Sequence, residues 1–237
     1  MSKNGSRIIS FGRYRATDLI IFAVVLVAFG LISFFAFTKW FADDPTNFFF
    51  SLAVPISLIV MIRWNWYGMF YAVFDGILYC TLIVLSAGSA YYSDALRYFI
   101  TYGIGNAFIG LAYLMVHWMG YKRIASNAGF TVLYVLCGWG AVELGRSVVS
   151  MFFGAAPGVA FSGFFFGPSE LLSLAVSVVL FLVLRKLDGM LENQRAYLLR
   201  LDKERQEKMM RDTFGDEPVE IDTEALKSLN KKGGDMF

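Results

Sequence analysis

The sequence has little of what most catalytic sites are built from. His117 is the only histidine in 237 residues, and the only two cysteines, Cys80 and Cys137, both fall in apolar stretches. A histidine-based metal site, a nucleophile with a histidine partner and a disulfide framework are therefore not expected. A glycine-rich phosphate loop ending in GK[ST] is also missing, which argues against ATP hydrolysis by this chain. The sequence predicts a protein that is not an enzyme and that holds no metal or cofactor.

Charge is also scarce, because charged residues make up only 17% of the chain while 57% of the residues are hydrophobic. Ordinary soluble domains are about 25% charged. Several apolar stretches approach or exceed the ~20 residues that a helix needs to cross a bilayer. The composition predicts an all-α membrane protein. We expect six transmembrane helices, at about residues 17–41, 47–62, 67–85, 98–119, 129–154 and 170–184.

Proline and glycine predict two irregularities in this pattern. Pro55 falls inside the second expected helix and should kink it, because proline removes an internal hydrogen bond. Residues 155–169 are apolar but rich in glycine and proline. We expect them to form a folded-back lid at the membrane surface rather than a helix.

The turns between the expected helices predict the topology. Basic residues lie at the N-terminus, at Arg63, at Lys122 and Arg123, and after residue 184, whereas the intervening loops are mostly acidic or uncharged. The positive-inside rule then places both termini in the cytoplasm. Charge and composition divide the chain further. The expected parts are a cytoplasmic N-terminal segment (1–16), a six-helix transmembrane domain (17–184), a cytoplasmic charged amphipathic helix (185–213) and a disordered tail (214–237).

Residues 129–154 are long enough to cross a bilayer, yet they carry Glu143 and Arg146 near their middle. An ionised side chain at that depth costs at least ~2.5–3.5 kcal/mol, so such residues normally face a protein interior or a water-filled cavity. A spacing of three puts both side chains on one helical face, where they can pair. Two interpretations stay open: a structural ion pair that joins helices, or a pair that lines a binding cavity.

Two segments resemble a known family. They are PISLIVMIRWNWYGMFYAVFDGILY (residues 55–79) and FITYGIGNAFIGLAYLMVHW (residues 99–118). With six short spans, they are similar to the substrate-binding S components of energy-coupling factor transporters. The resemblance implies a high-affinity binding subunit for a small vitamin-like micronutrient in a bacterial cell membrane. Its implied partners are the lipid bilayer, a transmembrane coupling subunit and two ATPase subunits that supply energy, without any nucleic acid.

The resemblance also implies which residues act. A pocket would form from the outer halves of the last three helices and the outer loops, with a contribution from the third helix. The positions that fit this pocket are Arg97, Tyr102, Asn106, Trp139, Glu143, Arg146, Glu170 and Asp75. Ala16, Ala23 and Gly30 recur every seven residues, and this small-residue stripe is either close packing within the bundle or the docking face for the coupling subunit.

An alternative hypothesis makes the protein a membrane scaffold without transport activity, similar to an MreD-like cell-shape protein. The charged helix at 185–213 would then recruit cytoplasmic partners. Glu143 and Arg146 would be structural in that case. A self-sufficient secondary transporter is disfavoured, because the six short spans show no inverted repeat.

Overall fold

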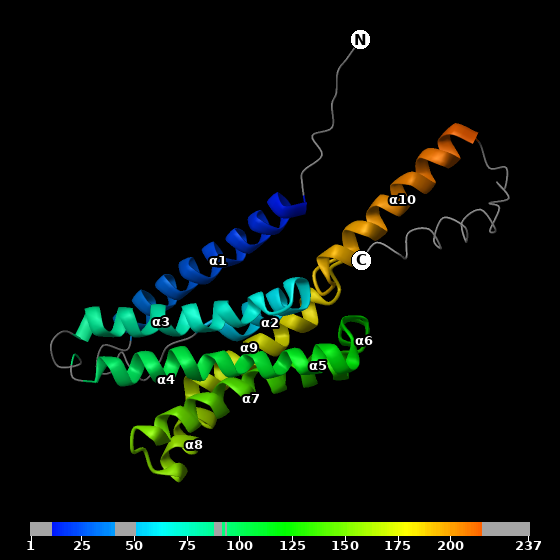
Figure 1. Ribbon diagram of the computed structural model, residues 1–237. Coiled ribbons are helices and arrows are strands. Elements are labelled where there is room, and N and C mark those ends of the chain that lie inside the picture. Colours follow the sequence, from blue (N-terminus) through cyan, green and yellow to red (C-terminus); the bar gives the residue numbers. More distant parts are fainter. Residues whose placement is uncertain (1–10, 41–50, 88–91, 93, 215–237) are drawn as a thin grey trace, which may run out of the picture. The chain divides into compact units, whose positions relative to one another are not determined.

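The computed structural model describes residues 11–40, 51–87, 92 and 94–214, and every regular element within them is a helix (Figure 1). The chain divides into two compact units, one up to Gln194 and one from Arg195. Each unit is described by itself. Most of the expected N-terminal segment and nearly all of the expected tail lie outside the described residues.

The first unit contains nine α-helices and one 3₁₀ turn within the described residues. They are α1 (Phe11–Trp40), α2 (Ala53–Trp64), α3 (Tyr67–Ala87), α4 (Ala95–Ala107), η2 (Phe108–Gly110), α5 (Leu111–Met119), α6 (Tyr121–Ser126), α7 (Ala128–Phe152), α8 (Pro157–Phe165) and α9 (Pro168–Leu184). Helix α10 (Gln194–Phe214) begins at the boundary between the units.

Four described stretches are long and apolar enough to cross a membrane: α1, α3, the run of α4, η2 and α5, and α7. The pair α8 and α9, bent by 44°, would make a fifth span. Helix α2 has 12 residues and is therefore roughly 18 Å long, shorter than the ~30 Å hydrocarbon core. The protein is thus all-helical, with four to five candidate membrane spans in its described part, and a multi-pass membrane protein is the plausible class.

Helix α2 is the most enclosed element, because all twelve of its residues are buried. It packs against α1, α3, α5, α7 and α9. Leu58 of α2 shares a core cluster with Tyr134 and Phe181, and the Tyr134 hydroxyl donates a hydrogen bond to the Leu58 carbonyl at 3.2 Å. A helix that is apolar on every side needs such surroundings.

The predicted kink at Pro55 is wrong. Ser51 and Leu52 are not helical, and α2 begins at Ala53, so Pro55 lies in the first turn. The first-turn N–H groups have no partner within a helix, and proline therefore fits there without distortion. The expected start of this helix, residues 47–50, lies outside the described residues.

The expectation for residues 155–169 also needs correction, since 157–165 form helix α8. Pro157 and Pro168 each stand at the start of a helix, where the fixed proline φ angle suits the first turn. Helix α7 ends before Gly154, whose φ of 85° suits a residue without a side chain. The prolines and glycines thus separate helices here rather than prevent them.

Two other boundaries differ from expectation. The charged helix starts at Gln194 rather than at residue 185, because residues 185–193 form turns that include Gly189 with a φ of 73°. Residues 120–123 were expected as a basic turn, but residues 121–123 belong to the short helix α6. The start of α7 is capped as its sequence suggests, since the Asn127 side chain accepts a hydrogen bond from the backbone N–H of Gly129 at 2.8 Å.

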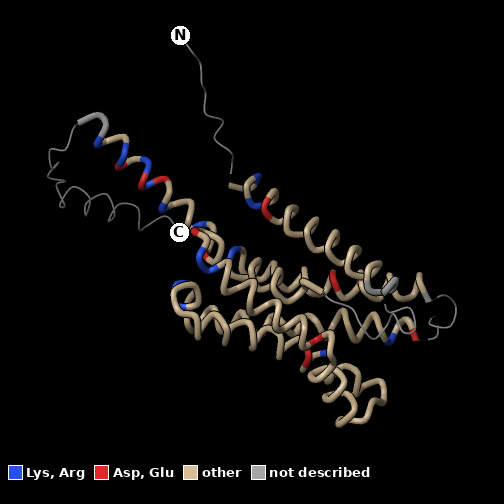
Figure 2. Tube along the Cα trace, turned by 180° about the vertical axis from the view of Figure 1, so that it is seen from behind, with Lys and Arg blue, Asp and Glu red and all other residues tan. Residues whose placement is uncertain are grey.

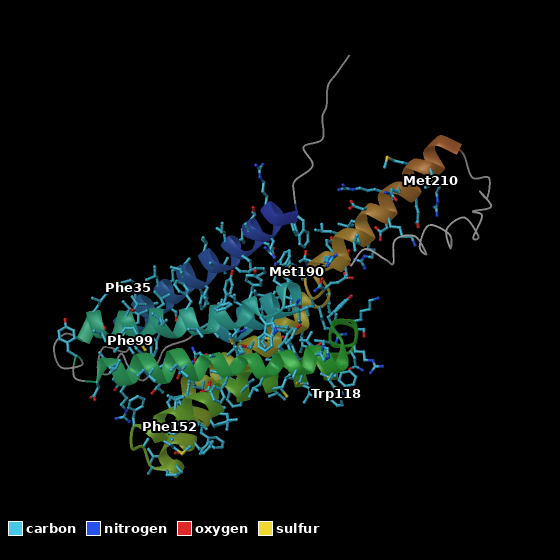
Figure 3. The ribbon with its side chains drawn as sticks, in the orientation of Figure 1. Phe35, Phe99, Trp118, Phe152, Met190 and Met210 are labelled. Carbon is cyan, nitrogen blue, oxygen red and sulfur yellow. The ribbon has the colours of Figure 1, made fainter. Side chains whose placement is uncertain are left out.

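The surface differs sharply between the two units. Large apolar side chains are exposed on the first unit, including Phe35, Trp118 and Phe152 (Figure 3). In Figure 2 its helices are almost entirely free of charged residues, whereas α10 alternates basic and acidic ones. Exposed apolar surface of this kind suits contact with lipid, and the polar surface of α10 suits water.

Candidate functional site

A cavity of about 390 Å³ lies among α3, α4, α7, α8 and α9. Its walls combine charged, hydroxyl-bearing and aromatic side chains. The charged and hydroxyl groups include Asp75, Arg97, Thr101, Arg146, Ser150 and Glu170, and the aromatic side chains are Tyr79, Tyr98, Tyr102 and Phe164.

Glycines bring the helices around this cavity into close contact. A Cβ atom added to Gly76 of α3 would lie 2.5 Å from the Tyr102 carbonyl oxygen of α4. One added to Gly105 of α4 would lie 2.8 Å from the Arg146 Cα atom of α7, and one on Gly145 would collide with the Gly105 carbonyl oxygen. Only residues without a side chain permit this approach. The three helices that carry Asp75, Asn106 and Arg146 are therefore held backbone against backbone.

Arg146 is the centre of the charged cluster. Its Nη1 donates to both carboxylate oxygens of Glu143, at 3.2 and 3.3 Å, and to Glu170 Oε1 at 2.9 Å. Its Nε donates to Asn106 Oδ1 at 2.7 Å. The predicted pairing of Glu143 with Arg146 is present, and Glu170 from the first turn of α9 joins it. One guanidinium is thus shared by two carboxylates.

Asn106 links three helices and has both ends of its amide occupied. Its Nδ2 donates to the Ala72 carbonyl of α3 at 2.9 Å, while its oxygen accepts from Arg146. Asn106 is completely buried and is absent from the cavity wall. Its position indicates that it orients Arg146 rather than contacting a ligand.

Asp75 lines the cavity, is only 2% exposed and has one carboxylate oxygen without a partner among the described residues. Its Oδ2 accepts a hydrogen bond from the Ser51 hydroxyl at 2.7 Å. Its Oδ1 has no hydrogen-bond partner among the described residues, and neither does the buried Thr101 hydroxyl in the same wall. Buried polar atoms are nearly always hydrogen-bonded, so an exception at a cavity indicates a group that a ligand or water can satisfy.

Aromatic rings form another part of the wall. Tyr102 packs edge to face against Tyr79 and Phe164, with ring centroids 5.1 and 6.1 Å apart. The Arg146 guanidinium lies 5.0 Å from the centre of the Tyr102 ring. The rings thus provide an apolar, π-rich surface next to the charged cluster.

A second buried arginine, Arg63, lies in a different network. Its Nε and Nη2 donate to the two carboxylate oxygens of Asp18 at 2.9 and 2.7 Å, and its Nη1 donates to the Gly189 carbonyl at 2.9 Å. Gln194 also donates to Gly189, and it accepts a hydrogen bond from the Tyr14 hydroxyl. This network joins α1, α2 and the turns after α9, and none of its members lines the cavity.

The structure brings most of the predicted pocket residues together. Arg97, Tyr102, Arg146, Glu170 and Asp75 line the cavity, and Asn106 and Glu143 lie behind Arg146. Trp139 does not line it, and its ring packs instead against Phe165 at 5.5 Å between centroids.

The small-residue stripe on α1 does not form one free surface. Ala16 is exposed, Ala23 is half-buried and Gly30 is buried. A Cβ atom on Gly30 would lie 3.5 Å from the Leu78 side chain of α3. The structure therefore shows close packing within the bundle at Gly30, and the docking role of the stripe stays a prediction.

The sequence-based prediction missed several wall residues. Tyr79, Thr101 and Ser150 each lie four positions after a predicted residue on the same helix, so helical periodicity could have found them. Phe164 belongs to α8, which was expected to be a lid without helical structure. Ser51 precedes α2, and its contact with Asp75 joins positions that no local pattern relates.

The chain was compared with models of protein families, with curated proteins and with solved structures. No protein-family model, no curated protein and no solved structure matches it.

Proposed function

We propose that this protein is the substrate-binding subunit of a membrane uptake system, of the kind that its sequence resembles. It would bind a small polar micronutrient in the cavity among α3, α4, α7, α8 and α9. A separate transmembrane subunit and two ATPase subunits would supply the energy, since this sequence carries no phosphate-binding loop of its own.

One observation carries the proposal. The charged cluster around Arg146 borders a cavity of about 390 Å³, and two residues of its wall, Asp75 and Thr101, each have a buried oxygen without a partner among the described residues. A purely structural ion cluster needs no cavity, and helices pack more tightly without one. Pockets for small ligands are mostly apolar and aromatic with a few converging polar groups, and their volume runs from about 300 to 1,000 Å³. The cavity here lies within that range of volume and combines aromatic rings with converging polar groups.

The proposed orientation places the cavity toward the outside and both termini in the cytoplasm. Helix α9 begins at the cavity with Ser169 and Glu170, and its other end leads to Arg185 and Lys186. Lys122 and Arg123 follow α5 in the same way, at the end of the run that begins beside the cavity. Basic residues thus follow the helix ends remote from the cavity, which supports a cytoplasmic location for those ends. With α2 and the residues before it counted as a span, the proposed number of spans is six.

Cysteine labelling tests this orientation on whole cells. Cys137 is first replaced by serine, while buried Cys80 stays in place. A membrane-impermeant maleimide should then label Tyr92→Cys but not Lys122→Cys. The opposite pattern would reverse the orientation and place the cavity on the cytoplasmic side.

Native mass spectrometry of the purified protein tests the binding function. The wild type, incubated with the small-molecule fraction of growth medium, should carry an extra mass of a few hundred daltons. Gly163→Leu should lose this mass, because Gly163 lines the cavity and a leucine side chain reduces its volume. Gly158→Leu is the matched control, since Gly158 belongs to the same helix but not to the cavity wall.

Neither glycine has a neighbour within 4 Å of an added Cβ atom, so both variants should fold. A wild-type protein that carries no small molecule under these conditions would contradict the proposal. Retention of the extra mass by Gly163→Leu would place the ligand elsewhere. The scaffold hypothesis predicts the first of these results.

A further inference from the structure

We propose that the ligand of this cavity carries a positively charged nitrogen that pairs with Asp75. The inference rests on the proposed function, because it assigns a chemical class to the molecule bound there. A protonated amine or a protonated nitrogen heterocycle belongs to this class.

The first argument is the unsatisfied oxygen of Asp75. The Ser51 hydroxyl donates a hydrogen bond to one carboxylate oxygen of Asp75. The other oxygen has no partner among the described residues, although Asp75 is only 2% exposed. A buried carboxylate is stable only when it is paired and hydrogen-bonded. A ligand N–H group that carries positive charge supplies both the hydrogen bond and the charge.

The second argument is the balance of buried charge around the cavity. Two buried carboxylates, those of Asp75 and Glu143, and the partly exposed carboxylate of Glu170 stand against one buried guanidinium, that of Arg146. Glu143 and Glu170 already share that guanidinium. Arg97 also lines the cavity, but its side chain is exposed and its charge is screened by solvent. The buried cluster therefore has an excess of negative charge, which favours a cation and disfavours an anion.

The third argument is the nature of the remaining wall. Tyr79, Tyr102 and Phe164 present aromatic rings, and a cation over an aromatic face is stabilised by the ring quadrupole. The Thr101 hydroxyl, also without a partner among the described residues, can accept a second N–H of the same group. A protonated amine attached to a ring uses each of these features.

Matched probes test the charge without knowledge of the natural ligand. There are three sets of probe molecules. Within each set the molecules share a ring and differ in one substituent, which is positively charged, neutral or negatively charged. They are benzylamine, benzamide and benzoate; 3-(aminomethyl)pyridine, nicotinamide and nicotinate; and tryptamine, indole-3-acetamide and indole-3-acetate. Binding of each probe to the full-length protein in detergent is measured by thermal shift over a concentration series.

In at least one set the amine should bind with a dissociation constant at least about tenfold lower than those of its amide and carboxylate partners. A charge-assisted hydrogen bond has about this effect. Asp75→Asn should remove the preference, since the amide keeps an oxygen for Ser51 but carries no charge. Asp94→Asn is the matched control, because Asp94 is exposed and does not line the cavity. It should bind the amines as the wild type does.

The outcomes separate this inference from the proposed function. Stronger binding of amides or carboxylates than of amines would overturn the charge assignment and support a binding cavity of another class. A shift caused by sodium or potassium chloride alone, with no further effect of amines, would make the cation inorganic and the inference wrong. No shift with any probe, together with no bound molecule in native mass spectrometry, would overturn both. If Asp75→Asn does not fold, the preference of the wild type for amines over amides and carboxylates within each set still decides whether the ligand is a cation.

Discussion

The two buried arginines, Arg63 and Arg146, belong to regions with different properties. Arg63 makes a two-pronged pair with Asp18, its Nη1 also donates to a backbone carbonyl, and it does not line the cavity. Arg146 is shared by two carboxylates, stands on the wall of a cavity and has Asp75 with an unsatisfied oxygen in the same wall.

This difference separates a structural ion pair from a candidate binding site. One cation paired with one carboxylate, with further hydrogen bonds to Gly189 and from Trp64, holds α1, α2 and the turns after α9 together, away from the cavity wall. Around Arg146, carboxylates outnumber the guanidinium and a cavity lies beside them, so a bound molecule can supply the missing interactions. A buried charge by itself therefore does not indicate function in this protein. The indication comes from unequal numbers of positive and negative groups and from their position at the cavity.

The largest effect is expected from Arg146→Met. The substitution leaves the fully buried carboxylate of Glu143 without a cation and removes the partner of the partly exposed Glu170. Loss of one partner from a buried ion pair typically destabilises by about 3–5 kcal/mol. Unfolding in detergent, followed by circular dichroism during titration with sodium dodecyl sulfate, measures the change.

A triple variant, Arg146→Met with Glu143→Gln and Glu170→Gln, is the control for this prediction. It removes all three charges and should recover much of the lost stability, but bound small molecule should remain absent. Glu170 has to be included, because it shares the guanidinium with Glu143. Normal ligand binding by a stable triple variant would show that this cluster is structural, like that of Arg63.

A smaller effect is expected from Arg63→Met, about 1.5–3 kcal/mol, the usual range for hydrogen bonds to charged groups. Asp18 keeps a hydrogen bond from the Trp64 indole, and its side chain is 15% exposed, so water compensates part of the loss. The double variant Asp18→Asn with Arg63→Met should regain stability and bind ligand as the wild type does. Loss of binding in that stable variant would remove the distinction between the two regions.

Gly145→Ala should destabilise the protein by about 1–3 kcal/mol, as expected for overpacking between two helices. The added methyl group collides with the Gly105 carbonyl of α4 and would separate α4 from α7. Gly140→Ala is the matched control on the same helix, since an added Cβ atom there has no neighbour within 4 Å. Its unfolding free energy should stay the same or rise slightly, because alanine favours helix. Equal behaviour of the two variants would contradict the close contact.

The smallest effect is expected for the exposed charges of α10. Lys203 lies 3.9 Å from Glu207, and both side chains are more than half exposed. Exposed pairs of this kind contribute about 0.3–0.5 kcal/mol. Lys203→Gln should therefore change the unfolding free energy by no more than about 0.5 kcal/mol and leave ligand binding unchanged. A change as large as that of Arg63→Met would show that α10 charges have partners beyond this pair.

Sequence reasoning predicted the long helices well, because a lipid environment imposes a simple rule of length and apolarity. The expected helices at 67–85, 98–119 and 129–154 correspond closely to α3, to the run from α4 to α5, and to α7. Prolines and glycines were harder to interpret. Pro55 and Pro157 stand at helix starts, where they cause no kink, and only the capping geometry distinguishes these positions from a helix interior.

The site was predictable in part for the same reason. Charges such as Glu143, Arg146 and Asp75 stand out in apolar stretches, and the structure brings them to one region. The sequence could not show that Asn106 has both amide ends occupied, that Trp139 points to Phe165 instead of the cavity, or that Ser51 reaches Asp75. Each of these depends on how separate helices meet, which no local pattern contains.

Helix α8 has a consequence for how the protein could change over evolution. It supplies one wall of the cavity with small or apolar residues, Val159, Ala160, Gly163 and Phe164, and it packs mainly on α7 and α9. Exchanges of size at these positions would alter the shape of the cavity without disturbing α2 or the backbone contacts made by the glycines. A lineage could therefore change the shape of the cavity through a nine-residue segment while the rest of the bundle is inherited unchanged.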